Sequence, residues 1–95
     1  MDIFGQIASR IIKEQALIIG PLAWQEAKKV AGLIASDTTG EVTLEGDKKT
    51  AIDNLVARYD RLFGRASHEV SKEAVVGLLA DLPPLNVPMS LRGGT

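Results

Sequence analysis

A heptad-like stripe of apolar residues in the second half of the chain constrains the fold more than any other feature. Its members are spaced alternately four and three residues apart: Ile52, Val56, Tyr59, Phe63, Ala66 and Val70. This spacing places all six on one face of an α-helix. The pattern keeps its phase through Gly64, and Asp47 is a residue type favoured as an N-cap. The sequence therefore predicts a helix from about residue 48 to residue 80.

The length of this helix leaves two arrangements open. Unbroken, it would extend about 50 Å at 1.5 Å per residue, whereas a compact chain of 95 residues is only about 32 Å across. The helix either breaks near residues 64–67, with Ser67 capping a new helix, or overhangs and buries its stripe against a second subunit. Because the phase continues through Gly64, we favour the unbroken helix. We predict that the six stripe residues form the interface of a homo-oligomer.

Two helices are expected before this point. Apolar residues recur at helical spacing over residues 3–19, and Asp2 is a suitable N-cap. Gly20 and Pro21 end that helix, because a residue before proline avoids the helical conformation and proline favours the first position of a new helix. The second helix is predicted to run from Pro21 to about Ala31.

The segment after the second helix alternates polar and apolar residues around a turn. Asp-Thr-Thr-Gly at residues 37–40 is typical of a turn, and Val42 and Leu44 alternate with polar residues. We predict strands near 33–36 and 41–45, with Val42 and Leu44 facing the core. The expected fold class is therefore α+β and mainly α: two N-terminal helices, a short β-hairpin and a long C-terminal helix, straight or kinked.

Proline determines the character of the end of the chain. Pro83, Pro84 and Pro88 exclude a regular helix and favour an extended, polyproline-like backbone. We therefore predict one small globular domain over residues 1–82, followed by a Pro-rich extended tail over residues 83–95. This tail either docks through its apolar residues or frays, and its last residues, from 92 onward, are expected to be disordered.

Composition and charge exclude several classes of protein. The chain has no cysteine, which rules out disulfides and thiolate metal sites and suits a reducing, cytoplasmic environment. Its formal net charge of −1 provides no overall attraction to nucleic acid or to an anionic membrane. The most apolar stretch, residues 16–24, is far shorter than the roughly 20 residues that cross a bilayer. We expect no membrane span.

The sequence offers no combination of side chains suited to catalysis. His68 is the one histidine, and Ser67 and Ser71 flank it without a nucleophile motif. The glycines at the two ends of residues 40–46 are spaced wrongly for a phosphate-binding loop, and Asp47 stands where that loop requires lysine. We therefore predict a non-enzymatic protein with no catalytic residues, no metal site and no cofactor.

A basic stripe suggests a different function. Arg58, Arg61 and Arg65 are spaced to share one helix face, from which they could contact a phosphate backbone. The neighbouring acidic residues Asp53 and Asp60 and the net charge of −1 favour instead a solvated face or ion pairs between subunits. We expect a homo-oligomeric scaffold, adaptor or regulatory subunit that binds itself and another protein. The alternative is a small nucleic-acid-binding protein.

Overall fold

Helices make up most of the computed structural model, which describes residues 2–92. The regular elements are α1 (Ile3–Ile19), α2 (Leu22–Ala27), β1 (Leu33–Ala35), β2 (Val42–Leu44), α3 (Lys48–Phe63), α4 (Arg65–Ala74) and α5 (Val76–Leu79), followed by the 3-10 turns η1 (Pro84–Asn86) and η2 (Met89–Leu91). The prediction of a mainly helical α+β fold is confirmed. The long C-terminal helix is not present: α3, α4 and α5 occupy that part of the chain.

Both predicted N-caps are confirmed. Asp2 accepts a hydrogen bond from the backbone N–H of Gly5 at 2.8 Å, and Asp47 accepts one from that of Thr50 at 3.2 Å. Each bond satisfies an amide that the first turn of a helix leaves without a partner. Lys48 also forms an ion pair with Asp2, to which its ammonium group donates a hydrogen bond. This hydrogen bond is the main cause of the lowered pKa of Asp2. The beginnings of α1 and α3 are therefore held together.

The joint at Gly20 and Pro21 is confirmed, but the second helix is shorter than predicted. Gly20 adopts a φ of +69° at the end of α1, and α2 ends at Ala27 rather than near Ala31. The backbone N–H of Val30 bonds to Ala27 O in a turn, and the Val30 side chain is buried. The chain therefore leaves the helix four residues earlier than predicted, and Val30 joins the core from a turn.

The predicted hairpin is confirmed, with strands slightly shorter than expected. Strands β1 and β2 pair antiparallel with Leu33 opposite Leu44 and Ala35 opposite Val42. Val42 and Leu44 are buried, whereas Thr43 between them is exposed, as the alternation predicts.

The hairpin is anchored on α1 by a buried hydrogen bond. The Ser9 hydroxyl donates to the backbone oxygen of Gly40 at 2.7 Å. Residues from α1, the hairpin and α3 share one core. This packing stabilises the hairpin, because an isolated two-stranded sheet is only marginally stable in water.

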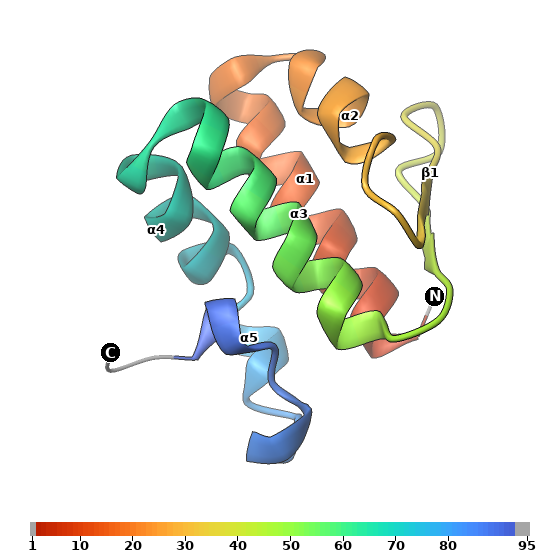
Figure 1. The fold of residues 1–95 in the computed structure, drawn as a ribbon, viewed down its shortest axis with the longest axis vertical. Helices are drawn as coiled ribbons and strands as arrows, with labels where there is room; N and C mark the ends of the chain where they lie inside the picture. Colours follow the sequence, from red (N-terminus) through yellow and green to blue (C-terminus); the bar gives the residue numbers. More distant parts are fainter. Residues whose placement is uncertain (1, 93–95) are drawn as a thin grey trace.

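The core lies between α1 and α3, which run side by side, with α4 packed back against both of them (Figure 1). Completely buried aliphatic side chains come from α1 and from α3: Ile7, Ile11, Ile12, Ile52, Leu55 and Val56. The hairpin covers one side of this layer, and the C-terminal segment, blue in Figure 1, closes its lower end. Within residues 2–92 no helix is both long enough and apolar enough to cross a membrane.

The prediction of an unbroken helix through Gly64 is wrong. Helix α3 ends at Phe63 and α4 begins at Arg65, and Gly64 between them has φ +87° and ψ −172°. This backbone conformation is essentially restricted to glycine. The break lets α4 turn back against α1 and α3 (Figure 1). The longest dimension of the molecule is 31 Å, into which a helix of about 50 Å does not fit.

A buried polar contact joins α4 to α1. The side-chain amide of Gln15 donates to the backbone oxygen of Ser67 at 2.8 Å and to the hydroxyl of Ser71 at 3.1 Å. All three residues are buried. Because a polar group is costly to bury without a partner, these bonds fix the position of α4 on α1. Ser67 lies inside α4, whose N-cap is Gly64, and not at the N-cap that the broken-helix alternative assigned to it.

The Pro-rich C-terminal segment packs against α3 instead of extending as a tail. The backbone N–H and the hydroxyl of Ser90 both donate to Asp53, at 3.0 and 2.5 Å. Lys49 donates to the backbone oxygen of Leu85 at 2.9 Å, and Leu91 is almost completely buried. Of the alternatives left open by the sequence, docking is the one observed.

The segment follows a path that the prolines alone did not indicate. Its residues form two 3-10 turns. Pro83 directly precedes η1 and Pro88 directly precedes η2, and both prolines have an extended backbone. The boundary predicted after residue 82 therefore does not separate a body from a free tail. Arg92 has an extended backbone, and residues 93–95, expected to be disordered, lie outside the described residues.

Candidate interaction groove

The structure divides the predicted interface stripe into two parts. Ile52, Val56 and Tyr59 are completely buried against the chain's own helices. They are not accessible to a second subunit, which corrects their assignment to an oligomer interface. The physical reason is that α3 packs against α1, α2 and α4 of the same chain, so these three residues belong to the chain's own core.

The second half of the stripe, Phe63, Ala66 and Val70, lines a surface groove. Together with Ile18 and Ile19 from the end of α1, these residues surround a hollow of about 260 Å³ whose floor includes Gln15 and Ser67. A second hollow of about 400 Å³ continues from it and shares two of its residues. We call the combined feature the α1–α4 groove, and the residues that line its second part are Arg10, Glu14, Leu17, Ile18, Val70, Glu73 and Ala74.

The α1 side of this groove presents large apolar side chains to solvent. Leu17 is 80% exposed and Ile18 is 65% exposed. Single exposed apolar residues are ordinary, but adjacent ones beside an apolar hollow are typical of a surface that another molecule covers. The groove is therefore the strongest candidate for an interaction site in the described part of the chain.

The helical periodicity of residues 3–19 did not identify Leu17 and Ile18 as surface residues. The signal was present in the sequence. Consecutive residues of a helix point about 100° apart, so Leu17, Ile18 and Ile19 cannot all lie on one face. At least one of three successive apolar residues must point away from the core.

The three arginines of the predicted basic stripe lie in different surroundings. Arg58 is partly buried, and its Nε donates to Glu26 at 2.9 Å. Arg61 is exposed and lines a hollow of about 230 Å³ together with Arg58 and Lys29. Arg65 belongs to α4, beyond the break, and lies in a separate polar hollow. The continuous stripe expected of a nucleic-acid contact is therefore interrupted at Gly64.

Glu26 is the centre of a charge cluster that joins α2 to α3. This residue is buried and accepts hydrogen bonds from Lys29 at 3.1 Å and from Arg58 at 2.9 Å. The bond from Lys29, followed by that from Arg58, holds the pKa of Glu26 below its usual value. The cluster neutralises much of the positive charge that Arg58 would otherwise offer to a phosphate.

We expect Glu26→Gln to weaken the acid sensitivity of folding. Because the pKa of Glu26 is lowered in the folded state, its contribution to stability is present above the usual value of 4.5 and is lost as the pH falls through the folded-state pKa. The free energy of unfolding should therefore fall less between about pH 5 and about pH 3 in the variant than in the wild type. Urea unfolding at several pH values measures this difference.

A matched control separates this effect from a change in total charge. Glu45 is exposed, and its carboxylate has no hydrogen bond or ion pair among residues 2–92. Glu45→Gln should keep the wild-type dependence on pH. Asp2 and Asp47 also have lowered pKa values, so part of the acid sensitivity remains in every variant. If the free energy of unfolding falls equally with decreasing pH in the wild type and in Glu26→Gln, the prediction is contradicted.

His68 pairs with a residue that sequence spacing did not connect to it. Its Nδ1 lies 2.5 Å from Oδ2 of Asp60, across the break between α3 and α4. Arg65, Glu69 and Lys72 line the same polar hollow. The contact depends on the turn at Gly64, since in a straight helix two residues eight positions apart are about 12 Å apart along the axis. It gives the short α3–α4 connection a second fixed point.

Residues 2–92 contain no group of three or more histidine, aspartate or glutamate side chains placed to hold a metal ion. Comparisons with protein-family models, with curated proteins and with solved structures found no match to this chain. Among the surfaces of the described residues, the α1–α4 groove places two adjacent exposed aliphatic side chains, Leu17 and Ile18, beside an apolar hollow.

Proposed function

We propose that this protein is a small non-enzymatic homo-oligomer that acts through protein–protein contacts, as a scaffold, adaptor or regulatory subunit. The observation that supports the proposal is the α1–α4 groove. It combines the exposed Leu17 and Ile18 with the part of the stripe that stays accessible, which consists of the exposed Ala66 and the partly buried Phe63 and Val70.

The chemistry of the groove suits a second copy of the same chain. Its edge carries charges of both signs, with Arg10 and Glu14 on α1 and Glu73 on α4. In a two-fold dimer each surface meets an identical one, so Arg10 of one copy can pair with Glu73 of the other. The net charge of −1 adds little repulsion between copies. Burial of exposed apolar side chains such as Leu17 and Ile18 would supply most of the favourable free energy.

We expect the wild-type chain to sediment at about twice its single-chain mass of 10.2 kDa at micromolar concentration. Ile18→Glu should sediment at the single-chain mass, because it places a charge in the middle of the apolar contact. Ile18 is 65% exposed, so the variant should keep the wild-type circular dichroism. Sedimentation equilibrium over a range of concentrations is the measurement.

Ile34→Glu is the matched control. Ile34 is the same residue type and is 55% exposed, but it lies on the hairpin strand β1 outside the groove. It should leave the dimer intact. A wild type that remains at the single-chain mass would overturn the proposal, and so would a dimer that Ile34→Glu dissociates as readily as Ile18→Glu does.

A further inference from the structure

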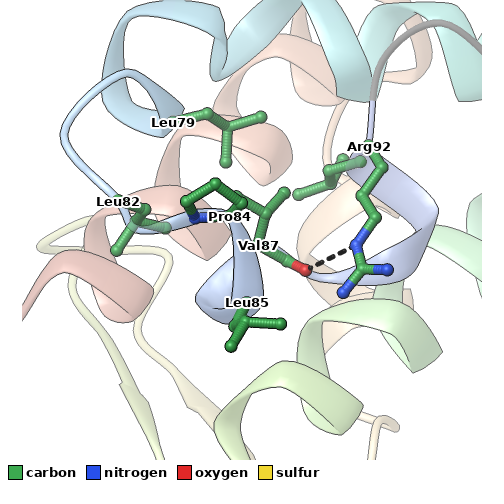
Figure 2. A pocket seen from close by; sticks show the side chains of 7 residues that line it. Leu79, Leu82, Pro84, Leu85, Val87 and Arg92 are labelled. Carbon is green, nitrogen blue, oxygen red and sulfur yellow. Dashed lines mark hydrogen bonds between the residues drawn. The ribbon is translucent and has the colours of Figure 1, made fainter.

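A second apolar hollow lies at the C-terminal end of the molecule, away from the α1–α4 groove. It is open to solvent, has a volume of about 460 Å³, and is lined by residues of α5, of the two 3-10 turns and of the segments beside them (Figure 2). We call it the C-terminal hollow. The residues that line it are Leu79, Leu82, Pro84, Leu85, Val87, Leu91 and Arg92.

The lining of this hollow is aliphatic except at one position. Figure 2 shows leucine, proline and valine side chains around it, with Arg92 at one side. Sugars and nucleotides require several hydrogen-bonding side chains, whereas Arg92 is the one polar side chain in the described lining. The lining therefore suits a ligand that is an aliphatic chain over most of its length.

Arg92 determines what the other end of such a ligand should be. Its Nε donates to the backbone oxygen of Val87 at 3.3 Å, which directs the guanidinium along the side of the hollow (Figure 2). Arg92 is exposed and has no carboxylate partner among residues 2–92. A guanidinium with unpaired N–H groups is the side chain best suited to bind a carboxylate.

We propose that the C-terminal hollow binds a medium-chain aliphatic carboxylate, such as a fatty acid. The chain lies among the leucine side chains and the carboxylate accepts hydrogen bonds from Arg92. A volume of about 460 Å³ lies within the range usual for small-molecule sites, about 300–1,000 Å³. The exposed position of Leu85, at 79%, means that the ligand would cover an apolar side chain that water now contacts.

Titration of the full chain with decanoate below its micellar concentration tests this proposal, with decanol as the matched ligand that lacks the carboxylate. Leucine methyl shifts in NMR spectra report the site and the affinity. We expect decanoate to shift methyls of Leu79, Leu82 and Leu91 and to bind about tenfold more tightly than decanol, the effect of one charged hydrogen-bonding contact.

Three single substitutions at exposed positions separate the contribution of the carboxylate to binding from that of the aliphatic chain. Arg92→Gln should weaken decanoate about tenfold and leave decanol unchanged. Leu85→Gln should weaken both ligands, because it removes apolar lining. Met89→Gln is the control, since Met89 is 73% exposed in the same segment but does not line the hollow.

Several outcomes would overturn the assignment. One is equal affinity for decanoate and decanol that Arg92→Gln does not change, which would indicate unspecific apolar contact. Another is loss of binding in Met89→Gln equal to that in Leu85→Gln. A third is binding of an apolar peptide through its C-terminal carboxylate without binding of decanoate, which would assign the hollow to a protein partner.

Discussion

Replacing Tyr59 with alanine is expected to lower the free energy of unfolding by about 3–5 kcal/mol, the range for truncating a buried aromatic side chain. Tyr59 is completely buried, and its ring centroid lies 6.4 Å from that of Phe63. Its hydroxyl donates to the backbone oxygen of Ala23 at 2.7 Å, which ties α3 to α2. Burial raises the pKa of this hydroxyl, so it remains a neutral donor at physiological pH. Urea unfolding followed by circular dichroism measures the loss.

Two companion variants divide this effect into its parts. Tyr59→Phe keeps the ring and should cost about 1 kcal/mol, the net value of a buried hydrogen bond. Leu62 lies on the exposed side of the same helix, so Leu62→Ala should change the free energy of unfolding by no more than about 0.5 kcal/mol. A loss below about 1 kcal/mol for Tyr59→Ala would show that Tyr59 is not a core residue.

Replacing Gly64 with alanine should destabilise the protein by about 1–3 kcal/mol, the cost of placing a side chain in a backbone region reserved for glycine. The added Cβ would meet no atom within 4 Å, so the cost comes from the backbone conformation alone. An unbroken helix would give the opposite sign, because alanine is about 1 kcal/mol better than glycine inside a helix. The direction of the change in melting temperature therefore distinguishes the two architectures.

Gly77→Ala is the matched control for this experiment. Gly77 lies in α5, has no positive φ, and leaves open space for a Cβ. Alanine at this position should leave the melting temperature unchanged or raise it, by up to about 1 kcal/mol in stability. If Gly64→Ala melts higher than the wild type, the break between α3 and α4 is not part of the folded protein in solution, and the long helix regains support.

Features that depend on neighbouring residues were predictable from the sequence. The caps at Asp2 and Asp47 use a side chain and an amide three positions apart, and the joint at Gly20 and Pro21 follows from the backbone restrictions of those two residues. The hairpin was predictable because its alternating pattern and its turn lie within a dozen residues. Each of these choices is made by local sterics and hydrogen bonding.

The candidate site was predictable only in part. Periodicity identified Phe63, Ala66 and Val70 as members of an apolar face, and they do line the α1–α4 groove. It gave no means of knowing that Leu17 and Ile18 would lie beside them. The two sets of residues are about fifty positions apart in the chain, and the contact exists only because α4 turns back onto α1.

The apolar stripe itself was determined by the sequence alone, but what covers it was decided by the tertiary structure. Regular spacing shows which residues share a helix face, and that face was correct from Ile52 to Tyr59. It does not show whether the helix axis continues, because glycine at position 64 is compatible with both a helix and a break. The break is held by contacts between distant residues, Gln15 with Ser67 and Ser71 and His68 with Asp60. Their free energy arises only when α1, α3 and α4 are packed together, so no local pattern in the sequence could reveal it.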